Sequence, residues 1–165
     1  MWVAGAGVKN LLQGRRMPDR ATHVRVGAAS GLVVAGYGAR HAPGDELLAE
    51  MLGGLIGGVI GGALPDVLEP STSPNHRQLA HSVVAGGAMT LARVTEWQAS
   101  CRSRADASAA RARTFPIGHA KRSHAEFEAL AWRALAGILV GLVAGYLSHL
   151  VLDSGTARGL PFVGG

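Results

Sequence analysis

The stretch ALAGILVGLVAGYLSHLVL, residues 134–152, runs for 19 residues without Asp, Glu, Lys or Arg. As an α-helix rising about 1.5 Å per residue it covers roughly 28 Å, close to the roughly 30 Å of a bilayer core. Arg133 and Asp153 flank it, so the apolar run has sharp ends. The stretch predicts one membrane-spanning helix near the C-terminus.

Three shorter stretches lack the same four residue types: Val26–Ala39, Met51–Pro65 and Gln78–Ala92. Their length alone also fits buried helices of a soluble protein or re-entrant segments. Their many glycines and few aromatic residues would pack a poor soluble core but suit close contact between membrane helices. We therefore expect an all-α fold, an integral membrane bundle of about four Gly-rich helices.

The composition of the 165-residue chain agrees with a membrane location, because 48% of residues are apolar and only 16% are charged. Soluble domains carry about 25% charged residues, and a large soluble multidomain enzyme is excluded. The net charge of +5 raises nucleic acid as a partner, but no basic stretch is interleaved with aromatic residues. Arginines also flank membrane spans, so we expect the lipid bilayer as the partner and no nucleic acid.

The sequence suggests one domain with two irregular parts. Residues 1–21 form a basic N-terminal segment without the features of a cleavable signal peptide, and translation starts at Met1 or at Met17. Residues 22–165 are expected to form a single membrane-embedded, metal-binding domain. Within it, residues 93–128 are rich in Ala, Arg and Ser, which predicts a flexible basic loop. Lys and Arg are divided almost equally between the two ends of the bundle, so the orientation stays open.

Two glycine rows recur at four-residue spacing, and each leads to polar residues. One row is Gly54, Gly58 and Gly62, followed by Asp66, and the other is Gly137, Gly141 and Gly145, followed by His149 and Asp153. Small residues at this spacing allow helix backbones to approach closely. The rows therefore predict helix contacts that bring polar helix ends together.

Polar residues at the helix ends are expected to meet at one rim of the bundle. In an antiparallel bundle the starts of odd-numbered helices and the ends of even-numbered helices coincide. The residues at these positions are His23, Asp66, Glu69, His76, His81, His149 and Asp153. Because His149 and Asp153 are four residues apart, they share one helix face. Cys101 is the only cysteine, so a metal ion here would use imidazole and carboxylate donors, which favour Zn²⁺ over Mn²⁺ or Fe²⁺.

Four motifs give a family resemblance: THVRVG (22–27), LPDVLEP (64–70), NHRQLAHS (75–82) and GYLSHLVLD (145–153). Together they resemble the membrane-bound metal-dependent hydrolase family typified by the YdjM inner-membrane proteins, some of which are LexA-regulated. The resemblance implies a multi-pass inner-membrane protein whose metal ligands are His23, Asp66, His76, His81, His149 and Asp153. Many members carry an acid two residues after the first Asp of this set. Here that position is Leu68, and Glu69 lies beside it.

The expected function is that of a membrane-bound, metal-dependent hydrolase. A metal-activated water would attack a lipid or phosphoester-type substrate at headgroup level. In this interpretation Glu69 is the general base, Asp66 is a ligand or bridging carboxylate, and Arg77 holds the substrate's anionic group. The alternative is a non-enzymatic membrane protein, either a metal carrier or a stress- or phage-related component with a structural metal site.

Overall fold

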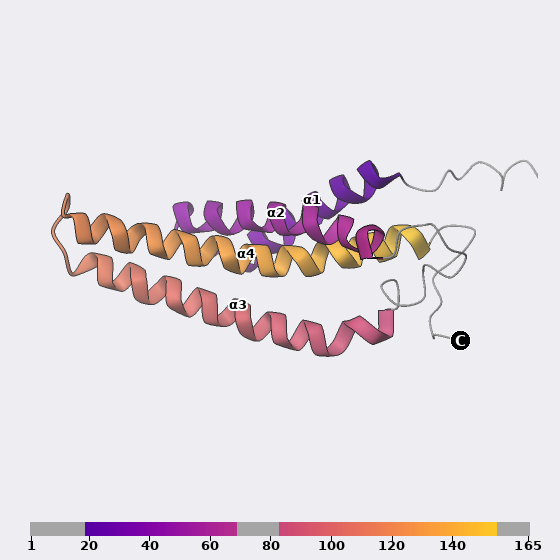
Figure 1. Cartoon of the computed structure of the whole chain (residues 1–165). Helices are drawn as coiled ribbons and strands as arrows, with labels where there is room; N and C mark the ends of the chain where they lie inside the picture. The colour runs from indigo at the N-terminus through magenta and orange to yellow at the C-terminus, as the bar shows by residue number, and fades with distance from the viewer. Residues whose placement is uncertain (1–18, 69–82, 155–165) are drawn as a thin grey trace, which may run out of the picture.

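The computed structural model describes residues 19–68 and 83–154, and these ranges contain four α-helices and no strand. The helices are α1 (Arg20–Gly38), α2 (Gly44–Leu68), α3 (Val83–Arg113) and α4 (Ala120–Ser154). Successive helices run in opposite directions, as Figure 1 shows, so α2 and α4 are parallel to each other. The expectation of an all-α, four-helix bundle is confirmed.

Helix α4 is the centre of the arrangement. Its backbone packs against each of the other three helices, whereas the backbone of α3 packs against α4 alone and reaches α2 through the side chain of Arg102. The hairpin formed by α3 and α4 extends well beyond the start of α2, at the left of Figure 1. The bundle therefore has one compact end, where α1 begins and α4 finishes, and one end from which a helical hairpin projects.

Burial in this bundle is inverted relative to a soluble protein. The buried apolar side chains of the described residues are alanines together with Cys101 and Leu150, and the largest fully buried side chains are His149, Glu50 and Pro65. Large apolar side chains lie outside instead: Val33, Val34, Leu48, Leu52, Leu55, Ile56, Ile60, Val67, Leu135, Leu147 and Val151. An apolar surface around a small and polar interior is what a lipid solvent requires.

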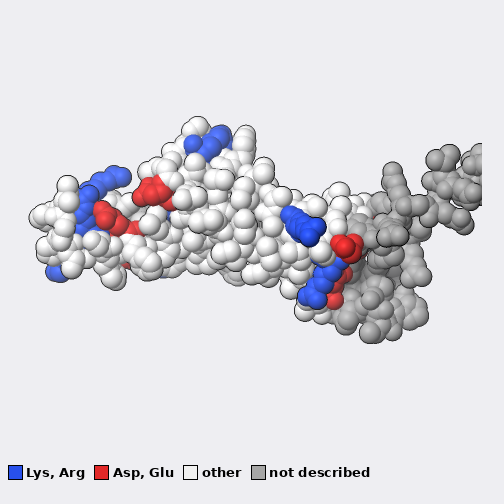
Figure 2. All heavy atoms as spheres, turned by 90° about the horizontal axis from the view of Figure 1, so that it is seen from above, with Lys and Arg blue, Asp and Glu red and all other residues white. Residues whose placement is uncertain are grey.

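Two helices, α2 over Gly44–Val67 and α4 over Ala120–Ser154, are long and apolar enough to cross a membrane. Neither α1 nor the described part of α3 meets the same test, although the sequence suggested four embedded helices. On the face seen in Figure 2, charged side chains gather in two groups along the length of the molecule, with an uncharged band between them. That band is the part of the molecule suited to the bilayer core.

Three rows of residues spaced by four line the contacts between α1, α2 and α4. The α1 row is His23, Gly27, Gly31 and Ala35; the α2 row is Glu46, Glu50, Gly54, Gly58, Gly62 and Asp66; the α4 row is Arg133, Gly137, Gly141, Gly145, His149 and Asp153. The α2 and α4 rows are in register with an offset of 87 residues, as two side-chain contacts between them show. Each row has glycines in its middle and polar groups at one or both ends.

The glycines of these rows allow backbones to touch. A Cβ added at Gly58 would lie 2.1 Å from the carbonyl oxygen of Gly27, and one added at Gly141 would lie 2.2 Å from that of Gly54. The contact predicted from the glycine spacing is therefore present. A second α2 row, which the sequence reading missed, packs against the backbone of α4 and consists of Gly53, Gly57 and Gly61.

Replacing Gly58 or Gly141 with leucine is expected to prevent this packing. The clash is with backbone, so the loss of stability should exceed the roughly 1–3 kcal/mol typical of an overpacked core. Size-exclusion profiles and melting temperatures in detergent measure the effect. Gly44→Ala is the matched control, because no atom lies within 4 Å of its added Cβ. An unchanged melting temperature in the leucine variants would show that the rows face lipid.

The prediction of a flexible loop at residues 93–128 is wrong. Helix α3 continues to Arg113 and α4 begins at Ala120, so only a short turn separates them. Ion pairs join the two helices there, including Arg111 with Glu128, and alanine is the strongest helix former. Helix α2 includes Pro65 and continues to Leu68, since a proline in the last turn removes only one helical hydrogen bond.

A network of five charged side chains, of which Glu46, Glu50 and Arg133 are buried, joins α2, α3 and α4 near the start of α2. Arg133 donates to Glu46 at 2.7 Å and to Asp106 at 2.6 Å, and its third contact is with Glu50 at 3.5 Å. Arg102 Nε donates to Glu50 Oε1 at 2.9 Å. Glu50 is completely buried and Arg133 is 8% exposed, so these charges depend on one another for solvation.

Candidate metal centre

The first residue of the candidate site, His23, lies in the first turn of α1. Asp19 caps this helix, because its side chain accepts hydrogen bonds from the backbone N–H and the hydroxyl of Thr22. Those hydrogen bonds lower the pKa of the Asp19 carboxyl, which is fully exposed. The cap fixes where α1 begins. It thereby places His23 at the first position of the α1 row, where it is 3% exposed.

His149 is held by the backbone of α2. Its Nδ1 lies 2.8 Å from the carbonyl oxygen of Gly62. A carbonyl oxygen accepts hydrogen bonds only, so Nδ1 is the donor, and this bond orients the ring. The close approach of α2 and α4 at Gly145 makes the contact possible. Metal-ligating histidines commonly donate the N–H of the other ring nitrogen to a backbone carbonyl in this way.

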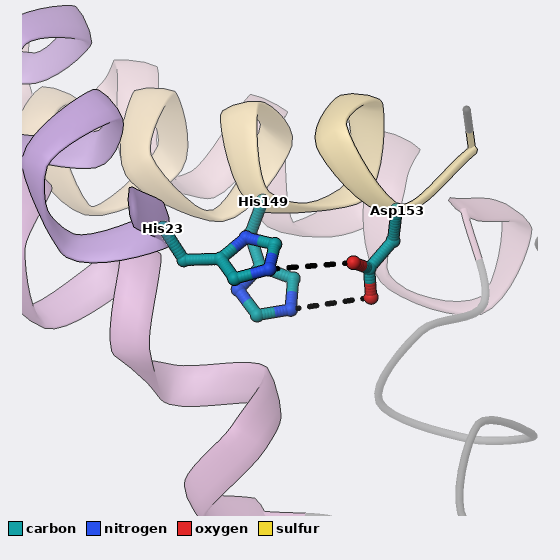
Figure 3. Close-up of side chains that lie close together, drawn as sticks. All are labelled: His23, His149 and Asp153. Atoms are coloured by element: carbon teal, nitrogen blue, oxygen red, sulfur yellow. Dashed lines mark ion pairs between the residues drawn. The ribbon is translucent and has the colours of Figure 1, made fainter. Parts of the chain in front are cut away.

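Asp153 lies one turn after His149 and faces both imidazoles, as Figure 3 shows. Its Oδ1 is 3.4 Å from His23 Nε2, and its Oδ2 is 3.6 Å from His149 Nε2. The two rings are stacked with centroids 3.9 Å apart and an interplanar angle of 24°. The three side chains come from the two ends of the described chain and meet in the interior.

Asp66 extends the cluster toward α2. Its Oδ1 lies 3.6 Å from His149 Nε2, and its side chain is 38% exposed. The same nitrogen is therefore approached by carboxylate oxygens from two helices. Asp66 is the partly exposed side of a cluster whose other members, His23, His149 and Asp153, are almost completely buried.

The donor set fits a divalent cation. His23, His149 and Asp153 each offer one ligand atom, and these atoms lie within 4.8 Å of one another. With bonds of about 2.0–2.1 Å, ligand atoms of a tetrahedral zinc site are roughly 3.3 Å apart. The distances of 3.4 Å from His23 Nε2 to Asp153 Oδ1 and 3.6 Å from His149 Nε2 to Asp153 Oδ2 are near this value. Imidazole and carboxylate donors also suit Mn²⁺ and Fe²⁺.

The site expected from the sequence is thus partly assembled among the described residues. His23, His149 and Asp153 are brought together, and Asp66 is beside His149. The remaining expected members, Glu69, His76, Arg77 and His81, lie outside the described residues. The sequence reading missed the Gly62 carbonyl as the group that orients His149, although Gly62 stands at the end of the glycine row, four residues before Asp66.

Fold and site define a class: an all-α membrane protein with a histidine and aspartate cluster buried at one end of its bundle. The family described as "YdjM inner membrane protein" matches residues 17–163, and the chain belongs to that family. The comparisons with curated proteins and with solved structures gave no match. The family description and the two apolar helices together support an inner-membrane location.

Proposed function

We propose that the protein is a metal-dependent hydrolase that crosses the inner membrane several times. The observation that carries the proposal is the environment of His149 Nε2. Because Nδ1 donates to Gly62, the neutral form of His149 directs the lone pair of Nε2 toward carboxylate oxygens of Asp66 and Asp153 at 3.6 Å. A cation between His149 Nε2 and the two carboxylate oxygens would stabilise all three electron-rich atoms.

Helix direction supports the proposed multi-pass topology. Helices α2 and α4 are the two candidate spans, and both run toward the end of the bundle that holds the cluster. Two parallel spans require the chain to return across the membrane between them. Helix α3 is the only described helix on that path, so we propose that it crosses as well, and α1 packs beside α2 as a further crossing.

In this proposal His23, His149 and Asp153 hold one divalent ion, and Asp66, His76 and His81 complete the donor set. When bound, the ion would polarise the scissile bond and supply an activated water at neutral pH. The remaining roles belong to Glu69 and Arg77.

Glu69, three residues after Asp66, takes up the proton as general base. Arg77 holds an anionic substrate group, for which a lipid phosphoester at headgroup level is the best fit.

A structural metal site without catalysis is the second candidate. It is favoured by the burial of the cluster, since His23, His149 and Asp153 are 3%, 0% and 3% exposed. Structural sites are closed by protein ligands, whereas catalytic sites keep one position open. The partly exposed Asp66 is the feature that favours catalysis.

Glu69→Gln separates the two candidates, because it keeps the shape of the side chain and removes the base. A hydrolase should retain its bound ion and lose at least about 100-fold in turnover, the usual scale of general-base catalysis. The assay is a panel of phosphoester, carboxylester and amide substrates in lipid micelles, with metal restored after chelation. Glu126→Gln is the control, because Glu126 is exposed and pairs with Arg122 at the far end of α4. If fully metal-loaded wild type turns over no substrate on the panel, the structural role replaces the catalytic one.

A further inference from the structure

The outward face of α3 carries charges at the depth where α4 carries none. Arg93 and Glu96 form an ion pair at 3.7 Å, and their side chains are 73% and 65% exposed. Helix α3 ends at Arg113 and α4 begins at Ala120, so residues counted back from Arg113 lie level with residues counted forward from Ala120. Glu96 is therefore level with Gly137 and Arg93 with Val140, both inside the charge-free stretch 134–152.

Contact with lipid is unfavourable for this face of α3. An ion pair exposed to hydrocarbon loses the hydration of both members, and charged residues in membrane helices therefore face protein or water. Among the described residues, the backbone of α3 packs against α4 alone, and those residues leave Arg93 and Glu96 uncovered. If α3 crosses the membrane, as the proposed topology requires, another surface must cover Arg93 and Glu96.

We infer that a second copy of this chain covers the outward face of α3, so that the protein is a dimer with α3 at its centre. The face is self-complementary in charge. In a pair related by a two-fold axis along the membrane normal, the two α3 helices are parallel, and Arg93 can reach the partner's Glu96 while Glu96 reaches the partner's Arg93. The exposed Ala99, Ser100 and Ser103 on the following turns are small enough for close backbone approach. This inference rests on the proposed crossing by α3, and the experiment tests the two separately.

The test uses full-length protein reconstituted in vesicles of phosphatidylethanolamine and phosphatidylglycerol, with Cys101→Ser as background. Ala92→Cys, next to Arg93 on the exposed face and level with Gly141, is expected to give a disulfide-linked dimer with copper phenanthroline and to resist a membrane-impermeant maleimide. Ile56→Cys is the control, because Ile56 is 50% exposed on α2 and lies level with Val143 through the 87-residue offset, close to the depth of Ala92. It should stay monomeric under the same oxidation.

The possible outcomes have separate meanings. Protection of Ala92→Cys from maleimide without cross-linking would overturn the dimer and leave the crossing intact. Rapid labelling of Ala92→Cys would overturn the crossing by α3 and with it the dimer.

Charge variants test the same interface without an introduced thiol. Arg93→Glu places like charges across the interface and should lower the dimer fraction at least ten-fold, measured by single-molecule photobleaching of wild-type and variant vesicles. The double variant Arg93→Glu with Glu96→Arg keeps the ion pair within each α3 and should restore the dimer. Monomeric wild type in this measurement, or a dimer unaffected by Arg93→Glu, would contradict the inference.

Discussion

His149→Ala is expected to abolish the stabilisation of the protein by zinc. A ligand that binds only the folded state stabilises it by about 2.7 kcal/mol at a concentration 100 times its dissociation constant. Wild type should therefore melt at a higher temperature as Zn²⁺ is added in detergent, and the variant should not respond. The reason is that His149 stands at the centre of the cluster, with contacts to both Asp66 and Asp153.

His124→Ala is the matched control for this measurement. It removes an exposed imidazole from the same helix, far from the cluster, and should leave the zinc response unchanged. An equal rise in melting temperature for wild type and His149→Ala would mean that zinc binds elsewhere. That result would contradict the assignment of His149 as a ligand.

Arg133→Met is expected to have the largest effect on folding. Removing one member of a buried ion pair leaves the others without compensation and typically costs about 3–5 kcal/mol. Arg133 contacts Glu46, Glu50 and Asp106, so the variant leaves two buried carboxylates short of a counter-charge. Melting curves and the yield of monodisperse protein in detergent measure the loss.

Arg113→Met serves as its comparison, because Arg113 is exposed near the end of α3 and its removal should change stability by less than about 0.5 kcal/mol. A second variant, Arg133→Lys, keeps the positive charge but loses the planar fork, and should be intermediate. If Arg133→Met melts like wild type, the network does not hold the three helices together.

Local spacing explains how much of the fold the sequence predicted. Four-residue repeats identify a helix face without knowledge of its partner, so the glycine rows ending at Asp66 and His149 were visible and their close packing is confirmed. The pairing of His149 with Asp153 was visible for the same reason. Alternating helix direction then placed His23 at the same rim, where the structure also has it.

Features that depend on distant partners were not predictable in this way. Arg133 meets Glu46 across 87 positions of the chain, and nothing local distinguishes it from an arginine at a membrane boundary. The length of α3 was missed because its apolar pattern is weak and ion pairs with α4, such as Arg111 with Glu128, stabilise it. The Gly62 carbonyl was missed because backbone groups leave no signal in the residue type.

The central claim is that the buried histidine and aspartate cluster binds a divalent metal ion. Elemental analysis of detergent-purified wild type beside His149→Ala tests it most directly. The account predicts at least about one zinc, manganese or iron ion per chain in wild type and only traces in the variant. Wild type that carries no divalent transition metal above the level of the variant, even after incubation with Zn²⁺ and removal of the excess, would contradict it.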